Sequence, residues 1–225
     1  MATLKFLAII PAYNEEASIQ NITQSAGKFL PICVVDDGSS DRTVERAQEA
    51  GAHVIMHEKN KGKGAALRTG FHYALRQDVS AVITLDADGQ HEPREIPRFL
   101  DAFQEKEYDL IIGARNFAQM PFSRRLANTI GKTVYSWAAG QKILDNQCGY
   151  RLIERGLLEF LLDSQEPGFE YEMEMILVCL KNRFKLGWLP IQTIYGEEKS
   201  HIRSLPHVKN FFRMALKIRS ELFTK

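Results

Sequence analysis

The sequence lacks the features that mark secreted disulfide-rich, membrane-spanning or nucleic-acid-coating proteins. It has only three cysteines in 225 residues, an odd number without a CxxC pair, which favours buried thiols in a reducing cytosol over disulfides. No window reaches the roughly 18 apolar residues of a membrane span. The net charge of +1 argues against a general coat for nucleic acids. These absences leave a globular protein, long enough for one large domain or two small ones, with its oligomeric state open.

The amino terminus also lacks a secretory signal peptide. Lys5 interrupts a short apolar run that ends at Pro11. The longest apolar run of the second half, MILVCL at 175–180, is short and is followed by KNRFK. We therefore expect a cytoplasmic protein, with peripheral contact to the cytoplasmic face of a membrane as an alternative.

Two familiar phosphate-binding motifs are absent as well. A P-loop requires GxxxxGK followed by Ser or Thr, and GKGAA at 62–66 does not fit this pattern. A dinucleotide fingerprint, GxGxxG, would follow the first strand, where PAYNEE (11–16) contains no glycine. The sequence therefore argues against a classical dinucleotide or P-loop site.

What is present in the first half is an alternation of apolar, strand-like runs with helix-period segments. The runs are LKFLAII (4–10), ICVV (32–35), HVIM (53–56), AVITL (81–85) and LIIG (110–113), and the helical segments are 15–29, 41–50, 63–77 and 94–106. Continuous apolar strands separated by helices predict an α/β fold with a mainly parallel central sheet flanked by helices.

The second half is less regular. The pattern predicts helices over 123–139, 155–162 and 169–182, and one or two strands within 185–196. An amphipathic helix is expected over 208–223, where the residues of one apolar stripe are Val208, Phe211, Phe212, Ala215, Ile218 and Leu222, and those of a basic stripe are Lys209, Arg213 and Lys217.

The carboxyl-terminal segment 201–225 has a net charge of +5, which leaves −4 for residues 1–200. Two interpretations of its helix stay open. The helix packs on the core with a solvated basic face, or its basic face contacts an anionic membrane surface.

Polar segments follow each predicted strand of the first half, and in a parallel sheet they meet at one edge, where such folds bind ligands. The segments are PAYNEE (11–16), DDGSSD (36–41), HEKNKGKG (57–64), DADGQ (86–90) and ARN (114–116).

Asp86 and Asp88 are the sharpest feature of that edge. Side chains at i and i+2 of an extended segment share a face. Two such carboxylates suit Mg²⁺ or Mn²⁺, which prefer oxygen ligands and bridge to substrate phosphates. An acid/base pair would require two unequal environments, and a polar turn is the third interpretation. We expect no functional role for His91.

Asp36 and Asp37 form a second acidic pair at a strand end. Carboxylates there can accept hydrogen bonds from the N–H groups of uracil or guanine, or from ribose hydroxyls. The following Ser39, Ser40 and Asp41 are typical of a helix N-cap.

The motifs PAYNEE, VVDDGSSD, NKGKGAALRTG, TLDADGQHEP, GAR, DNQCGYRLI and EYEMEM follow one another in this order. Together they resemble the family 2 glycosyltransferases with the GT-A fold, over about residues 1–200, and within them the dolichol-phosphate mannosyltransferase branch. The resemblance implies one GT-A domain over 1–225. Within it, 1–115 would bind a UDP- or GDP-linked sugar, 116–200 would bind the acceptor, and 201–225 would be a basic amphipathic helix.

The resemblance also implies roles for matching positions. The nucleotide-sugar ligands would be Pro11, Tyr13, Glu15, Asp36, Asp37, Lys63, Arg68, Asp86, Ala87, Asp88, Ser200 and Arg203. The ligands of a divalent metal, Mg²⁺ or Mn²⁺, would be Asp86, Asp88 and Gln90. Arg115 and one of Arg124 or Arg125 resemble arginines that face an acceptor phosphate, a task that suits the guanidinium fork. Two features depart from the branch and bear on a lipid acceptor: His201 follows Ser200 where lysine is frequent, and the chain lacks the carboxyl-terminal membrane helices of many relatives.

The implied reaction is one inverting displacement at the anomeric carbon, in which cations stabilise the leaving diphosphate. A phosphate acceptor, such as a polyprenyl phosphate, needs no general base, whereas a hydroxyl acceptor of a glycan or glycolipid needs a carboxylate, for which Asp145 and Glu172 are the candidates. Two other classes stay open. A sugar nucleotidyltransferase would carry a glycine-rich basic loop after its first strand, and a silent nucleotide-sugar-binding protein would show no turnover.

Overall fold

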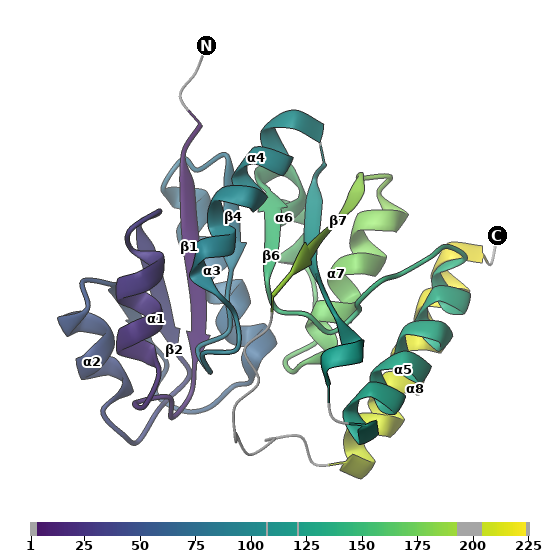
Figure 1. Ribbon diagram of the computed structural model, residues 1–225, viewed down its shortest axis with the longest axis horizontal. Coiled ribbons are helices and arrows are strands. Elements are labelled where there is room, and N and C mark those ends of the chain that lie inside the picture. Colours follow the sequence, from purple (N-terminus) through teal and green to yellow (C-terminus); the bar gives the residue numbers. More distant parts are fainter. Residues whose placement is uncertain (1–3, 107, 121, 193–203, 224–225) are drawn as a thin grey trace.

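The apolar runs of the first half form the centre of a seven-stranded sheet in the computed structural model, which describes residues 4–106, 108–120, 122–192 and 204–223. The strand order is β3-β2-β1-β4-β6-β5-β7 (Figure 1). The strands are β1 (Phe6–Ala12), β2 (Ile32–Asp36), β3 (His53–Met56), β4 (Ala81–Thr84), β5 (Leu110–Arg115), β6 (Arg151–Glu154) and β7 (Leu186–Ile191).

The sheet is mainly parallel, as predicted. Strand β1 pairs in parallel with β2 and β4, β2 with β3, and β5 with β7. Strands β1 to β5 therefore end at one edge, which we call the rim. The predicted polar segments lie there, next to one another.

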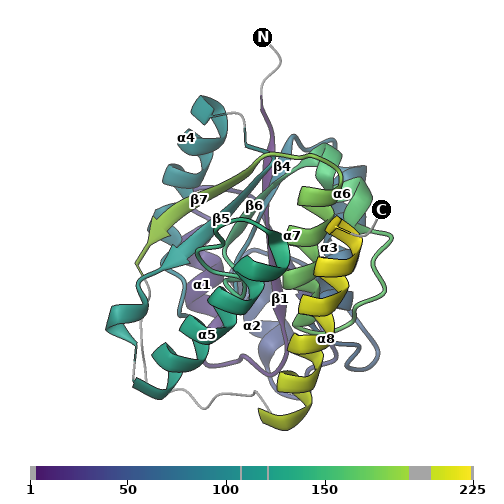
Figure 2. The ribbon, with the colours of Figure 1, turned by 90° about the vertical axis from the view of Figure 1, so that its right-hand side faces the viewer.

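Helices cover both faces of this sheet. In Figure 2, α1 and α4 lie on one side, and α3, α6 and α7 lie on the other. The helices are α1 (Ile19–Ala26), α2 (Thr43–Glu49), α3 (Lys63–Arg76), α4 (Ile96–Lys106), α5 (Phe122–Ala139), α6 (Arg155–Leu161), α7 (Glu170–Lys181) and α8 (Ser204–Phe223), with short 3₁₀ turns η1 (Pro93–Glu95) and η2 (Phe117–Gln119). No described helix is long and apolar enough to cross a bilayer.

Strand β6 is the element that the sequence pattern did not predict. It runs antiparallel between β4 and β5, and its four residues, RLIE, show no strand period of their own. Neighbouring strands on both sides decide its conformation, because strand preference depends on context. Since β6 begins where the others end, the segment before it, residues 145–150, lies at the rim.

Arg151 fixes this segment from below. Its side chain is fully buried, and its guanidinium donates to the carbonyls of Cys148 at 2.8 Å, Glu172 at 2.5 Å and Asn146 at 3.3 Å. Carbonyl oxygens are the partners that a buried guanidinium requires. One side chain thus joins β6, the 145–150 segment and the first turn of α7.

The carboxyl-terminal helix forms where expected, and the described residues of its predicted apolar stripe face the core with one exception. Phe212, assigned to the buried stripe, is 49% exposed, whereas Ala215 and Ile218 are buried. The basic stripe is not simply solvated, because Arg213 makes a bidentate ion pair with Glu166 at 2.7 Å and Lys217 pairs with Glu174 at 2.5 Å. Glu166 in the loop before α7 and Glu174 on α7 therefore hold these basic side chains, while Phe212 is exposed. The side chain of Val208 lies outside the described residues.

Candidate functional site

Two rim loops are joined side to side on the β1–β2 part of the rim. The Asn14 amide donates to the Ser39 hydroxyl, and the Asn14 side-chain oxygen accepts from the Ser40 amide, both at 2.8 Å. The Glu16 amide donates to Asp41 at 3.1 Å. Asn14 has a φ of +55°, a conformation that asparagine tolerates better than most residues. Asp41 also accepts from the Thr43 amide at 3.0 Å. It lies directly before Arg42, which is the N-cap residue of α2 in place of the predicted Ser39, Ser40 or Asp41.

Asp37 holds the neighbouring loop. Its buried carboxylate accepts from the backbone amides of Lys61 at 2.9 Å and Gly62 at 2.7 Å, and it lies 2.7 Å from His57 Nδ1. The carboxylate is thus committed to the chain itself. Its predicted contact with a nucleotide stays a prediction.

Asp36 retains an acceptor. Its Oδ2 accepts from the amides of Gly38 and Ser39 at 3.1 and 3.0 Å. Its Oδ1 is a buried atom without a hydrogen-bond partner among the described residues. Buried polar atoms are rarely left in that state, because the lost hydration costs free energy. Of the two adjacent aspartates, Asp36 has the oxygen that a ligand could satisfy.

Other predicted nucleotide ligands lie around these loops. Pro11 lies in β1, Tyr13 is 46% exposed at the rim, and Glu15 accepts from the Ser18 hydroxyl at 3.1 Å. Ala87 is buried within the turn formed by residues 86–90, which we call the acidic turn because it carries Asp86 and Asp88.

Lys63 joins the carboxylates of two distant segments. It is the first residue of α3, and its Nζ donates to Asp86 Oδ1 at 2.5 Å and to Glu172 Oε1 at 2.8 Å. Burial alone would lower the pKa of Lys63, but the two carboxylates outweigh it and raise that pKa. Burial would raise the pKa of Asp86, yet Lys63 holds it well below its usual value. The pair is therefore charged on both sides at neutral pH.

Glycines make this convergence possible. Gly62 has a φ of +95°, and a Cβ on Gly64 would lie 2.5 Å from the Glu166 carbonyl oxygen. The loop before α7 therefore packs directly on the first turn of α3, which brings Glu172 within reach of Lys63. The NKGKG stretch acts here as a close-approach loop.

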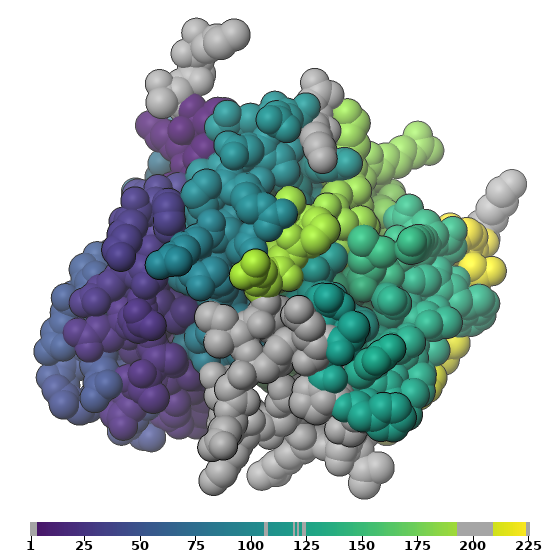
Figure 3. Space-filling model, in the orientation of Figure 1, coloured from purple at the N-terminus to yellow at the C-terminus, as the bar shows by residue number. Residues whose placement is uncertain are grey.

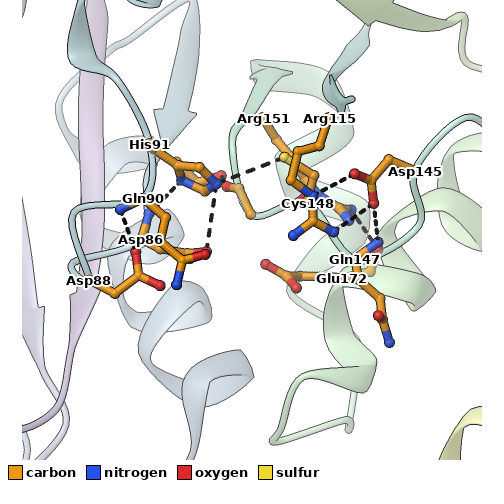
Figure 4. Close-up of polar contacts among 12 residues, drawn as sticks. Asp86, Asp88, Gln90, His91, Arg115, Asp145, Gln147, Cys148, Arg151 and Glu172 are labelled. Atoms are coloured by element: carbon orange, nitrogen blue, oxygen red, sulfur yellow. Dashed lines mark hydrogen bonds and ion pairs between the residues drawn. The ribbon is translucent and has the colours of Figure 1, made fainter. Parts of the chain in front are cut away.

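The acidic turn projects both of its carboxylates to one side (Figure 4). Gly89 has a φ of +79°, and Asp88 Oδ1 accepts from the Gln90 amide at 2.9 Å, which tightens the turn. A Cβ on Gly149 would lie only 2.4 Å from Asp86 Oδ1, so the Asp86 carboxylate rests against the backbone of the 145–150 segment.

The acidic turn fits a divalent cation that is shared with a substrate. No three acidic, histidine or cysteine side chains converge into a ready metal cage in the part of the chain that the structure describes. Mg²⁺ and Mn²⁺ at phosphate sites typically take one or two carboxylates and complete their shell with phosphate oxygens and water. Asp86 and Glu172 both contact the Lys63 ammonium, so these carboxylates stabilise a positive charge between them.

His91 is a residue that sequence reasoning left without a role. Its buried ring accepts the Asp86 amide on Nδ1 at 3.1 Å and packs 5.1 Å from the Tyr150 ring. Burial lowers the pKa of His91 to about 4, so the ring is neutral and carries its proton on Nε2, which lies 3.9 Å from Asp86 Oδ2. His91 therefore supports the backbone and the carboxylate of Asp86. The signal available was its position three residues after Asp88, within the same turn.

Arg115 lies across from the acidic turn, at the end of β5 (Figure 4). Its guanidinium makes two hydrogen bonds to Asp145, at 2.6 and 3.0 Å. Burial would lower the pKa of Arg115, but Asp145 raises it. Asp145 is 1% exposed and also accepts from the Gln147 amide, so it orients Arg115 rather than facing an open site.

A second cation accompanies Arg115. The ring of Phe117 lies 6.0 Å from the Arg115 guanidinium and 5.3 Å from the Lys132 ammonium. Lys132 was not predicted, although it follows Arg125 by seven residues, which places both on one side of α5. Arg125 is exposed, and the side chain of Arg124 lies outside the described residues.

One predicted nucleotide ligand lies away from this geometry, and two others are not described. Arg68 turns to the loop before α7, where it donates to the Glu166 carbonyl at 2.7 Å and lies over the Tyr171 ring. Ser200 and Arg203 lie outside the described residues. Their predicted contacts with the diphosphate stay predictions.

Comparison with known proteins identifies the family. The protein-family model described as "Glycosyl transferase family 2" matches residues 7–162. A polyprenol monophosphomannose synthase from Mycolicibacterium smegmatis is 32% identical over 207 residues, covering 84% of this chain and 77% of the relative. A UDP-N-acetylglucosamine–dolichyl-phosphate N-acetylglucosaminyltransferase from Methanococcus voltae is 29% identical, covering 88% of each chain. Glucosyl-3-phosphoglycerate synthase from Mycobacterium tuberculosis, solved with Mn²⁺, uridine diphosphate and phosphoglyceric acid, superimposes with a TM-score of 0.74 at 16% identity, over 98% of this chain and 78% of the other. This likeness confirms the predicted GT-A fold.

Proposed function

The chain belongs to glycosyltransferase family 2, and we propose that it transfers a sugar, with inversion, from a UDP- or GDP-linked donor to a polyprenyl phosphate. The observation that carries the proposal is the pairing of two charged centres at the rim. An acidic seat around Asp86, already attracting Lys63, faces an arginine that Asp145 holds in place. The names of the M. smegmatis and M. voltae relatives support the acceptor class.

The donor side would use the β1–β4 part of the rim. The unpartnered oxygen of Asp36 is suited to accept from a base or a ribose hydroxyl, with Tyr13 exposed beside it. Asp86, Asp88 and Gln90 would hold a divalent metal, which when bound neutralises charge on the leaving diphosphate. Lys63, which donates to Asp86 in the chain alone, would donate to a diphosphate oxygen when the donor is bound.

The acceptor side would use Arg115. The Nε and Nη2 of Arg115 are bound to Asp145, which fixes the guanidinium plane and leaves Nη1, which has no hydrogen-bond partner among the described residues, to donate to a phosphate oxygen. A monoalkyl phosphate is anionic at neutral pH, so it can attack the anomeric carbon without losing a proton to the enzyme. Both carboxylates considered as general bases are occupied, Asp145 by Arg115 and Glu172 by Lys63. That occupancy favours a phosphate acceptor over a hydroxyl. Such an acceptor would place the enzyme at the cytoplasmic face of a membrane.

The test compares a short-chain polyprenyl phosphate with the corresponding polyprenol. Thermal shifts with UDP-, GDP- and dTDP-sugars, with and without Mn²⁺, first identify the donor. We then expect release of nucleoside diphosphate with the lipid phosphate and not with the alcohol. Arg115→Gln should abolish this release, whereas Arg183→Gln, an exposed arginine beyond the opposite end of α7, should not. Equal turnover with the alcohol would assign the enzyme to hydroxyl acceptors, and no thermal shift with any donor would refute nucleotide-sugar binding.

A further inference from the structure

Exposed apolar side chains gather on two helices. Seven of the thirteen large apolar side chains that are exposed among the described residues lie on α5 and α8, and the other six are spread over the rest of the chain. The seven, which we call the α5–α8 face, are Phe122, Leu126, Ile130, Trp137, Phe212, Leu216 and Phe223. Clusters of this kind mark interaction sites, whereas single exposed apolar residues are ordinary.

The seven side chains form one continuous surface. On α5, Phe122 is followed by apolar residues 4, 8 and 15 positions later, all on one side of an α-helix. On α8 the spacing is 4 and 11 from Phe212, which again gives one side. The Arg219 guanidinium lies 5.2 Å from the Trp137 ring and 4.2 Å from the Phe223 ring, so it connects the two stripes.

The two helices lie side by side and form an outer wall of the molecule. Figure 2 shows them together in front of α7, and Figure 3 shows α5 on the outer surface. They meet at Gly131, where an added Cβ would lie 3.7 Å from the Phe211 ring, an ordinary contact distance. The helices therefore present a broad apolar face rather than a single stripe.

Among the described residues, the charged side chains of α5 and α8 are basic except for one glutamate. Residues 116–144 contain four basic side chains and no Asp or Glu. On α8, Lys209 and Arg219 flank the face, while the one acid of the helix, Glu221, pairs with Lys181 at 2.8 Å. The other two basic side chains of α8, Arg213 and Lys217, form ion pairs with Glu166 and Glu174.

We propose that the α5–α8 face docks on the surface of an anionic phospholipid bilayer. Its aromatic and aliphatic side chains would enter the boundary between headgroups and acyl chains, and the flanking Lys and Arg would contact anionic headgroups. A second copy of the chain fits less well, because two such faces would oppose like charges without an acidic partner. The contact surface differs from that of the sequence-based alternative, in which the basic stripe of α8 contacts the membrane.

The orientation gives this surface a purpose that rests on the proposed function. Helix α5 begins seven residues after Arg115, and Phe122 at that end is 80% exposed. A bilayer under the face would therefore lie next to the end of the site where a lipid phosphate is expected. The docking itself requires neither donor nor acceptor.

The experiment measures co-sedimentation of the full chain with vesicles of phosphatidylcholine containing about one-third phosphatidylglycerol, without donor or acceptor. We expect binding that weakens with added salt and with vesicles of phosphatidylcholine alone. The double variant Leu126→Gln/Leu216→Gln should lower the partition coefficient by about tenfold or more, since two half-exposed leucines lose their burial in lipid. The matched control Leu4→Gln/Met56→Gln removes exposed apolar side chains elsewhere and should bind as the unmodified chain does.

Tryptophan fluorescence gives a second measurement. In Trp188→Phe, the remaining Trp137 should shift its emission to shorter wavelength when vesicles are added. Absence of vesicle binding, or equal losses in the test and control variants, would overturn the proposal. So would a concentration-dependent dimer that Leu126→Gln/Leu216→Gln dissociates. Vesicle binding without any sugar transfer would leave the docking intact and refute the proposed function instead, while transfer to a detergent-solubilised acceptor without vesicle binding would do the reverse.

Discussion

Gly149→Ala tests whether the position of the Asp86 carboxylate controls activity. The added Cβ would lie 2.4 Å from Asp86 Oδ1 and 2.6 Å from Oδ2, whereas ordinary contacts begin near 3.4 Å. The carboxylate must therefore move by about 1 Å, and it would leave its 2.5 Å contact with Lys63. Displacements of about 1 Å in a catalytic constellation can cost roughly 100-fold in rate. We expect a loss of that order in kcat/KM and weaker Mn²⁺ dependence of turnover.

The assay is nucleoside diphosphate release at saturating acceptor over a Mn²⁺ titration. Overpacking of this kind costs about 1–3 kcal/mol, so the variant should stay folded, and thermal melting checks this at the assay temperature. Gly131→Ala is the matched control, since its Cβ meets only the edge of Phe211 at 3.7 Å. A Gly149→Ala enzyme with unchanged rate and unchanged Mn²⁺ dependence would refute the placement of the metal at Asp86.

Three further variants test the charges that hold the rim and the helices around it. Lys63→Met leaves Asp86 and the buried Glu172 without their shared cation, so the melting temperature should fall by several degrees. Mn²⁺ should raise the melting temperature more in this variant than in the unmodified protein. An equal Mn²⁺ shift in both would contradict the idea that the metal and the Lys63 ammonium share one site. Arg151→Met leaves three buried carbonyls without their donor, and since each such group costs about 1–3 kcal/mol, urea unfolding should show a loss of about 3 kcal/mol or more. A loss below about 1 kcal/mol would show that Arg151 does not hold β6 in place. The pKa of Glu166 is lowered from 4.5 chiefly by its hydrogen bonds from Arg213, so this pair stabilises the fold above pH 4.5 and loses its effect as the pH falls. Glu166→Gln should therefore lower the melting temperature at pH 7, and this decrease should shrink progressively as the pH falls below 4.5; a decrease that does not depend on pH would assign the effect to packing.

Much of the fold could be predicted because its strands carry their own signal. The apolar runs at 32–35 and 53–56 became β2 and β3 almost residue for residue. Strand β2 is buried throughout and needs continuous apolar sequence, whereas β3 lies at the sheet edge, where Val54 and Ile55 are half-buried and His53 and Met56 are exposed. Strand β6 could not be predicted in this way. Its conformation comes from β4 and β5 on either side, and the buried Arg151 at its start is the kind of residue that sequence patterns assign to a surface.

The candidate site shows the same division. The turn with Asp86, Asp88 and Gly89 could be predicted from spacing, because the two carboxylates are local to one turn. The contact of Lys63 with Glu172 spans 109 residues and depends on the close packing that Gly62 and Gly64 permit, which no local pattern indicates.

Phe212 of α8 was misassigned to the buried stripe for a related reason. Periodicity defines which residues share a side of a helix, but it does not say which side meets the protein. Glu166 and Glu174 bind the basic side chains, and that choice leaves Phe212 and Leu216 outside.

The charges at the rim give the acidic turn its meaning. Asp86, Asp88 and Glu172 are three carboxylates, and Lys63 is one ammonium, so this group carries a formal charge of minus two. A divalent cation balances that charge, and an incoming diphosphate would then bring new negative charge for Lys63 to meet. Across the site, Arg115 and Asp145 already cancel each other, which leaves the arginine oriented without adding a strong field. In the chain alone, the Lys63 ammonium contacts both Asp86 and Glu172 and thus offsets part of the repulsion among the three carboxylates. On this view Lys63 keeps the seat folded before metal and donor arrive, and the larger Mn²⁺ stabilisation expected for Lys63→Met follows from that role.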